Sequence, residues 1–66
     1  MTLKLDYTKT LIEDRGVVVV TVFDNGKIFF EIECFADSPY SIEEEIQNWL
    51  DDNGYEDEDF VFLLIK

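Results

Sequence analysis

Carboxylates are the side chains whose number and spacing in this chain suit a chemical role. Residues 31–66 hold twelve of the sixteen acids and one base, Lys66, whereas acids and bases balance in residues 1–30. The whole net charge of −11 therefore comes from the second half. Because such a one-sided field repels itself, a folded chain is expected to carry it on its surface. The candidate partner-binding residues are Glu43, Glu44, Glu45, Asp51, Asp52, Glu56, Asp57, Glu58 and Asp59.

The chemistry that these carboxylates could perform is recognition of a basic surface. On a helix, Glu44 and Asp51 point the same way and lie roughly 10.5 Å apart, at 1.5 Å per residue. The acids after Asp52 continue the line, so we predict a ridge of closely spaced negative charges. A nucleic acid strand likewise presents about one anion per 3.4 Å. A protein with such a ridge can occupy the basic groove of a nucleic-acid-binding protein.

A solvated helix face that serves only solubility is the competing interpretation of the same residues. Glutamates in a first helical turn are stabilised by the helix dipole, so Glu43 to Glu45 need no functional explanation. Asp51 and Asp52 are different, because anions are unfavourable near a helix C-terminus and no lysine lies four residues away. Adaptation to high salt also enriches acids, but the neutral first half argues against it.

The residue combinations that usually carry out nucleophilic catalysis are not found in the sequence. The chain has no histidine, so a Ser-His or Cys-His nucleophile pair cannot form. The single cysteine, Cys34, is expected inside a strand as a small apolar residue rather than as a reactive thiol. No glycine-rich phosphate loop is present, and so small a domain has little room for a cleft that would shift a carboxyl pKa. We therefore expect neither an enzyme nor a cofactor.

Metal binding is also disfavoured. With one cysteine and no histidine, the chain lacks the usual ligands of a zinc site. An EF-hand alignment that places Gly54 at loop position six puts Trp49 at position one and Phe60 at position twelve, where carboxylates are required. We expect no dedicated metal site, although weak cation binding by the acidic loop stays open.

The elements that would position the ridge can be read from the apolar pattern. Thr2 to about Ile12 alternates apolar and polar residues, and residues 17–23 and 28–35 are rich in β-branched and aromatic residues. Asn25-Gly26 between the last two predicts a type I′ hairpin with Asp24 opposite Lys27. Regular pairing from that turn places Phe23 opposite Ile28, Thr21 opposite Phe30, Val19 opposite Ile32 and Val17 opposite Cys34. We expect this face to be the core.

A helix and a final strand follow the hairpin. Ser41 and Glu44 form a capping box, with Ser38 before Pro39 as an alternative start. The residues Ile42, Ile46, Trp49 and Leu50 make one apolar stripe, and Gly54 is suited to end the helix. Residues 60–65 are apolar on both faces, as in a central or covered strand. The last strand can pair with the first, although periodicity does not determine the strand order.

These elements predict one α+β domain over residues 1–66. Its order is β-β-β-α-β, with an antiparallel or mixed four-stranded sheet and one helix packed on one face. The other hairpin face would carry Val18, Val20, Val22 and Phe29, which is unusually apolar for a solvated surface. This face either mediates self-association, making a homodimer or assembly module, or is covered by the first segment of the chain.

In its size, acidity and lack of histidine, and in its mixed αβ pattern, the chain resembles small DNA-mimic proteins. These include phage-encoded inhibitors of restriction or CRISPR nucleases and of host transcription factors. The resemblance is compositional and covers no motif, so it assigns no individual residue. It implies a non-catalytic inhibitor or modulator that binds a basic nucleic-acid-binding protein or nuclease. The alternative function is a structural module that self-associates through an apolar sheet face.

The expected partner is therefore a protein. A pI near 4.1 argues against direct binding to nucleic acid or to an anionic membrane. The N-terminal residues alternate instead of forming a long apolar run, and no stretch approaches the ~20 apolar residues of a membrane span. With one cysteine and no leader pattern, we expect a cytoplasmic protein.

Overall fold

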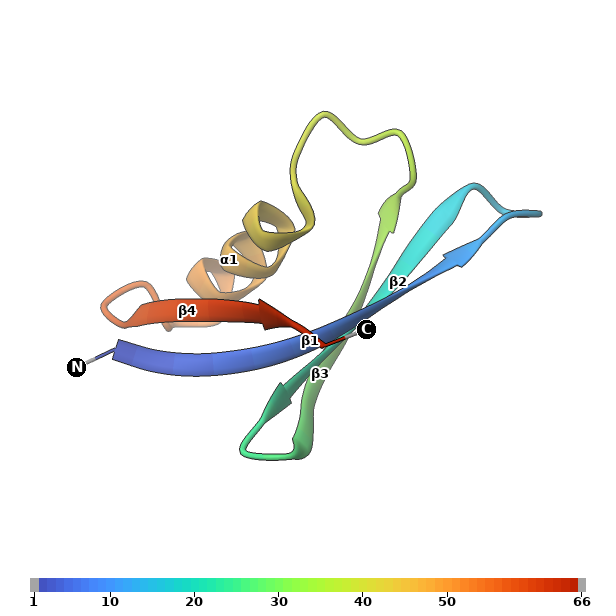
Figure 1. Ribbon diagram of the computed structural model, residues 1–66. Coiled ribbons are helices and arrows are strands. Elements are labelled where there is room, and N and C mark those ends of the chain that lie inside the picture. Colours follow the sequence, from blue (N-terminus) through green and yellow to red (C-terminus); the bar gives the residue numbers. More distant parts are fainter. Residues whose placement is uncertain (1, 66) are drawn as a thin grey trace.

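The computed structural model describes residues 2–65, which form four strands and one helix (Figure 1). The elements are β1 (Thr2–Ile12), β2 (Val17–Asp24), β3 (Lys27–Phe35), α1 (Ile42–Asp52) and β4 (Asp59–Leu64). The predicted α+β class and the β-β-β-α-β order are thereby confirmed.

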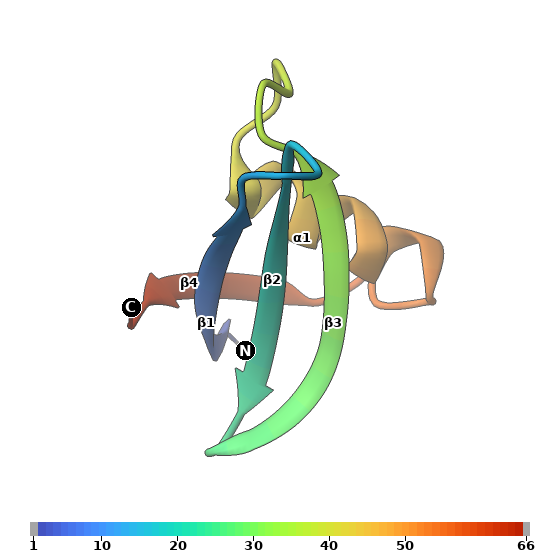
Figure 2. The same cartoon turned by 90° about the vertical axis from the view of Figure 1, so that its right-hand side faces the viewer.

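The four strands form one mixed sheet in the order β3-β2-β1-β4. The pairs β1–β2 and β2–β3 are antiparallel, whereas β1 and β4 are parallel. After β3 the chain passes through α1 and returns at the far edge of the sheet, beside β1. The sheet is strongly twisted, so β4 crosses behind β1 and β2 at a steep angle when the molecule is turned (Figure 2). This twist curves the sheet around the helix.

The hairpin turn has the predicted geometry. Asn25 and Gly26 both have positive φ, 53° and 82°, as a type I′ turn requires. Asp24 pairs with Lys27 and Phe23 pairs with Ile28, as predicted. Beyond these two pairs the predicted register is wrong, because the ladder shifts between Val22 and Phe23.

A β-bulge causes this shift, with Phe29 as the extra residue on β3. Val22 pairs with Phe30, and Val20 then pairs with Ile32 and Val18 with Cys34. Since side chains alternate between the two faces, a shift of one residue exchanges the faces of β2 relative to β3.

The exchange overturns the predicted outer face. Val20 and Val22 are fully buried, and Val18 and Phe29 are partly buried against the same core. The set Val18, Val20, Val22 and Phe29 is therefore no exposed self-association surface. The alternating residues Val17, Val19, Thr21 and Phe23 instead lie on the face away from the helix and are half-buried. The β3 residues Phe30, Ile32 and Cys34 do belong to the core face, as predicted.

The helix packs on this core face as its apolar stripe predicts. Ile46 and Leu50 are fully buried, with Leu5 and Tyr7 of β1 beneath the helix. Trp49 stacks on Phe30 with ring centroids 3.7 Å apart and planes 10° from parallel.

Local interactions define both ends of α1. The Ser41 hydroxyl accepts a hydrogen bond of 3.1 Å from the backbone N–H of Glu44, which confirms the predicted N-cap. At the other end Asn53 is the C-cap, and Gly54 follows with φ of 90°. The helix thus stops where the acidic loop begins. Within residues 2–65, the helix α1 is not long and apolar enough to cross a lipid bilayer.

Candidate functional site

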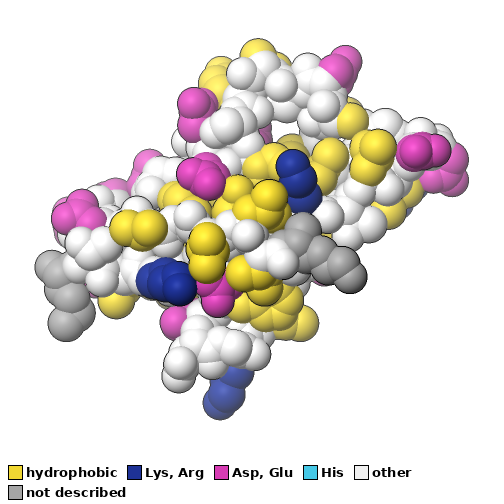
Figure 3. Space-filling view, in the orientation of Figure 1, with side chains coloured by type: hydrophobic (Ala, Val, Ile, Leu, Met, Phe, Trp, Pro, Cys, Tyr) yellow, Lys and Arg dark blue, Asp and Glu magenta, His cyan; other side chains and the backbone are white. Residues whose placement is uncertain are grey.

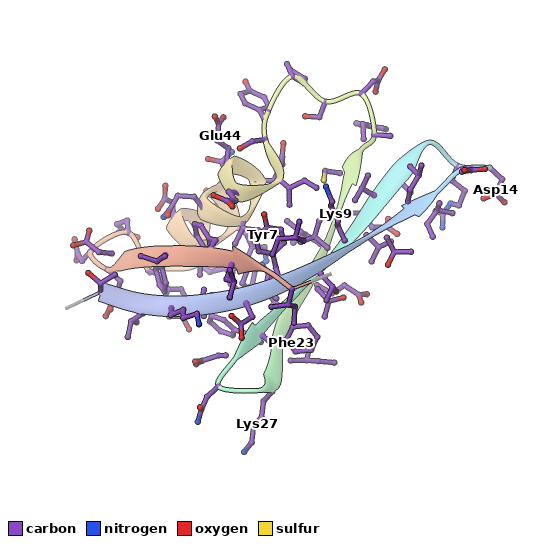
Figure 4. All side chains as sticks on the ribbon, in the orientation of Figure 1. Tyr7, Lys9, Asp14, Phe23, Lys27 and Glu44 are labelled. Atoms are coloured by element: carbon purple, nitrogen blue, oxygen red, sulfur yellow. The ribbon has the colours of Figure 1, made fainter. Side chains whose placement is uncertain are left out.

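The nine predicted partner-binding carboxylates, hereafter the acidic ridge, lie on α1, the following loop and the first residue of β4. They are Glu43, Glu44, Glu45, Asp51, Asp52, Glu56, Asp57, Glu58 and Asp59. Eight are exposed and Glu45 is half-buried. Burial of Ile46 and Leu50 fixes the rotation of the helix, so the opposite side must face solvent. Figure 4 shows Glu44 on the helix, directed away from the sheet.

Three ridge carboxylates accept hydrogen bonds from neighbouring side chains. The Tyr7 hydroxyl donates to Glu43 Oε2 at 3.0 Å, and Gln47 Nε2 donates to Asp51 Oδ1 at 2.9 Å. The Ser38 hydroxyl donates to Glu45 Oε1 at 3.5 Å. Glu43 and Glu45 therefore flank the helix on its sheet-facing borders and have structural roles as well. The most outward part of the ridge is Glu44, the two aspartates that end the helix, and the loop.

The ridge contains nine of the sixteen acids within seventeen consecutive residues that include no base. The basic residues Lys4, Lys9, Arg15 and Lys27 all lie on β1, at the β1–β2 turn or at the β2–β3 hairpin. Other acids lie far from the ridge, and Asp14 in Figure 4 is an example at the distant hairpin tip. Figure 3 accordingly shows acidic side chains at several places on the perimeter. The ridge is thus the densest acidic segment, but the rest of the surface is not free of acids.

Two titratable groups outside the ridge, Cys34 and Tyr7, have raised pKa values. Burial raises the pKa of the Cys34 thiol, and the negative charge of Glu45 raises it further. Burial also raises the pKa of Tyr7, as do the hydrogen bond to Glu43 and the charge of that carboxylate. Both shifts favour the neutral, unreactive form. Across residues 2–65, no three His, Cys, Asp or Glu side chains are grouped as a metal site would need.

Two features were not foreseen from the sequence. Asp6 lies on the uncovered face of β1, between Phe23 of β2 and Leu63 of β4, and is half-buried. Its Oδ1 is buried and has no hydrogen-bond partner within the described part of the chain. The alternating pattern of β1 placed Asp6 on this face correctly. Its apolar flanks depend on the strand order and the bulge, which no local signal reveals.

The second feature is a groove beyond the N-terminal end of the helix, where the core face continues onto the long hairpin. Lys9, Leu11, Val18, Ala36 and Ile42 line it. It exists because β1 and β2 extend past the end of α1, leaving Leu11 53% exposed. Figure 3 shows apolar side chains beside a basic one in this part of the surface.

Comparison of the chain with protein-family models, with curated proteins and with solved structures found no match.

Proposed function

We propose that this protein is a non-catalytic inhibitor or modulator whose acidic ridge binds the nucleic-acid-binding surface of a basic protein, as DNA mimics do. One observation carries the proposal: nine exposed or half-exposed carboxylates lie on a helix, the loop after it and the first residue of β4, without a basic residue among them. Electrostatic attraction to a cationic groove would make association fast and sensitive to salt.

The charge spacing on α1 supports this function. Glu43 and Asp52 are separated by nine residues, or about 13.5 Å along the helix axis. Five carboxylates lie within that length in two groups, Glu43–Glu45 and Asp51–Asp52. Their average density, roughly one per 3 Å, is close to the phosphate spacing of about 3.4 Å along a nucleic acid strand. Because the helix is packed by Ile46 and Leu50, these charges are held on a rigid element. A rigid array loses little conformational entropy on binding.

The C-terminal aspartates support binding rather than stability. The last turn of α1 contains Asp51 and Asp52 and no basic residue. Each of these anions at a helix C-terminus costs about 0.3–1 kcal/mol. The hydrogen bond from Gln47 offsets part of that cost for Asp51 only. Solubility does not require acids at these particular positions, whereas a continuous ridge does.

The test compares two variants with equal loss of charge. The ridge variant carries Asp51→Asn, Asp52→Asn, Glu56→Gln and Asp57→Asn. The control carries Glu13→Gln, Asp14→Asn, Glu31→Gln and Glu33→Gln, all outside the ridge. Immobilised wild type is used to capture proteins from a cell extract, and captured proteins are then purified and titrated at increasing salt.

The proposal requires that a captured protein bind duplex DNA, that DNA compete with its capture, and that affinity fall with salt. It also requires that the ridge variant lose at least tenfold in affinity while the control retains most of it. Equal binding by the two variants, or binding that DNA does not displace, would contradict it.

The alternative function, a module that self-associates through Val18, Val20, Val22 and Phe29, has no such surface to act through. Those side chains pack in the interior of the monomer. Self-association has to be considered at another place.

A further inference from the structure

We propose that β4 is a self-pairing edge, at which two copies of this chain join their sheets antiparallel about a two-fold axis through Phe62. The proposal is independent of the acidic ridge and of its partner. It rests on the hydrogen-bonding direction of β4, on its side chains and on the distribution of charge along the two edges of the sheet.

The first step concerns the backbone. β4 is an edge strand that pairs on one side only, with β1. The N–H of Ile65 donates to the carbonyl oxygen of Tyr7 at 2.9 Å, so Ile65 is directed toward β1. Because successive residues of a strand direct their backbone groups to opposite sides, Val61 and Leu63 also face β1. Phe60, Phe62 and Leu64 then direct their N–H and C=O groups outward from the edge.

The second step concerns the side chains. Residues 60–65 contain no charged residue, no proline and no glycine. Val61 is 53% exposed, Leu63 46% and Leu64 42%. Natural edge strands are normally protected from pairing by charges, prolines or bulges, and β4 has none of these between its first residue and Ile65. An apolar edge of this kind is a template for another strand.

The third step shows why β4 and not β3 is the pairing edge. β3 carries Glu31 and Glu33. Antiparallel pairing with the β3 of a second copy about Ile32 would place Glu31 of each copy directly opposite Glu33 of the other copy. Like charges in that position, with Cβ atoms about 5 Å apart, destabilise a sheet. The charges of β3 therefore protect its edge. The helix contacts β3 through Trp49, which stacks on Phe30, whereas the sheet pairing of β4 is with β1 alone.

The fourth step fixes the register. Pairing about Phe62 sets Phe62 opposite itself, Phe60 opposite Leu64 and Val61 opposite Leu63. Side chains that oppose each other across the pairing then point to the same side of the sheet. The core faces of the two copies therefore form one continuous face. The residues with outward backbone groups are then paired with one another: Phe62 with Phe62, and Phe60 with Leu64. Each such pair exchanges two N–H···O bonds between the two copies. Hydrogen bonding and side-chain direction thus select one register.

The fifth step shows that the charge of the chain permits this dimer. In this register Asp59 lies opposite Ile65 of the second copy, so the two Asp59 residues are six residues apart, or about 20 Å. The Debye length at physiological ionic strength is about 8 Å. Repulsion across the edge is therefore screened, although each copy carries a net charge of −11. The acidic ridge, which ends at Asp59, thus lies at the two outer ends of the paired strands.

The size of the contact sets the expected affinity. A six-residue edge contact belongs to the smallest class of interfaces, below about 1,200 Å² in total. We therefore expect a dissociation constant on the order of tens of micromolar. Sedimentation velocity from 10 µM to 1 mM protein should show a monomer that converts to a dimer.

Charge variants test the register. Val61→Lys and Leu63→Glu should each weaken the dimer at least tenfold. Mixing the two proteins should restore a heterodimer, because the introduced lysine of one copy then faces the introduced glutamate of the other. Phe35→Lys, at a 71% exposed apolar residue of β3, is the matched control and should leave dimerisation unchanged. Restoration on mixing also shows that both variants fold.

Amide hydrogen exchange gives a second measurement. The amides of Val61, Leu63 and Ile65 should be protected at every concentration, whereas those of Phe60, Phe62 and Leu64 should gain protection only as the dimer forms. A monomer at 1 mM would overturn the proposal. Dimerisation that survives both β4 variants, or that is lost in Phe35→Lys, would overturn it equally, because the interface would lie elsewhere.

Discussion

The hydroxyl of Tyr7 on β1 donates a hydrogen bond of 3.0 Å to Oε2 of Glu43 in the first turn of α1. Tyr7 is 6% exposed and Glu43 is exposed, so the bond runs from the core of the protein to its surface. The tyrosine ring packs beneath the helix, and its hydroxyl reaches a partner at the rim, as buried tyrosines normally do. The contact fixes the helix on the sheet and occupies one carboxylate of the acidic ridge.

Replacing Tyr7 with phenylalanine should lower the free energy of unfolding by about 1 kcal/mol, the typical net value of one hydrogen bond. The loss is limited because Glu43 can be rehydrated at the surface. Urea unfolding at pH 7 measures it, with Tyr40→Phe at a 57% exposed position as the control that should change nothing. A loss as large for Tyr40→Phe as for Tyr7→Phe would contradict the assigned role.

The same residue should affect stability at alkaline pH. Folding raises the pKa of Tyr7 above its usual value of 10.0, chiefly through burial and also through Glu43. The folded state therefore holds the phenolic proton more tightly than the unfolded state. The resulting stability is complete below pH 10 and is lost as pH rises through the folded pKa. Above pH 10, wild type should lose stability more steeply than Tyr7→Phe, and parallel curves would contradict the shift.

Two adjacent valines of β2 should differ strongly in their tolerance of the same substitution. Val20→Lys places an unpaired charge at a fully buried position and should prevent folding or cost several kcal/mol. Val19→Lys is matched in chemistry but lies on the uncovered face opposite Glu33, and should be within about 0.5 kcal/mol of wild type. Circular dichroism and urea unfolding of both variants measure this. If Val19→Lys were the more destabilising variant, the hairpin would have the regular register, without the bulge.

Two acids at opposite ends of α1 should also differ in sign. Asp52→Asn removes an anion from the unfavourable C-terminal end and should stabilise the protein, whereas Glu44→Gln removes one from the favourable N-terminal end. Each effect is about 0.3–1 kcal/mol. Both variants remove one negative charge, so the difference between them isolates the dipole term. The melting temperatures should diverge at 10 mM salt and converge at 500 mM, because salt screens the interaction.

The thiol of Cys34 should react slowly. Its pKa is raised from 9.0 by burial and, to a smaller extent, by Glu45, so little thiolate is present at pH 8. Alkylation by iodoacetamide should be severalfold slower than for an unstructured cysteine peptide. Glu45→Gln should accelerate it modestly, and Glu44→Gln should not. An equal effect of the two substitutions would show that Glu45 does not specifically raise the pKa of the Cys34 thiol.

Interactions between near neighbours in the chain made much of the fold predictable. The Asn25-Gly26 turn needs only positive φ at two residues, and the Ser41 cap needs only the N–H of Glu44 three residues on. The helix stripe follows from a repeat of 3.6 residues, so the burial of Ile46 and Leu50 was foreseen. The same reasoning placed the ridge carboxylates of α1 on its outer side.

The faces of the hairpin and the order of the strands needed the tertiary structure. Phe29 is the additional residue of the bulge, and its ring makes edge contacts with Phe30, Trp49 and Tyr55 at centroid distances of 5.2–5.8 Å. Two of those partners come from the helix and the loop after it, so no pattern within the hairpin could predict a bulge there.

The sequence by itself thus determined the elements, the turn, the helix cap and the concentration of acids in one segment, because each depends on residues a few positions apart. Only the tertiary structure decided which valines of β2 are buried, that Tyr7 meets Glu43, and that β4, which has no charge between Phe60 and Leu64, lies at the edge beside β1. These depend on contacts between distant segments, where a single inserted residue reverses which side chains face the core.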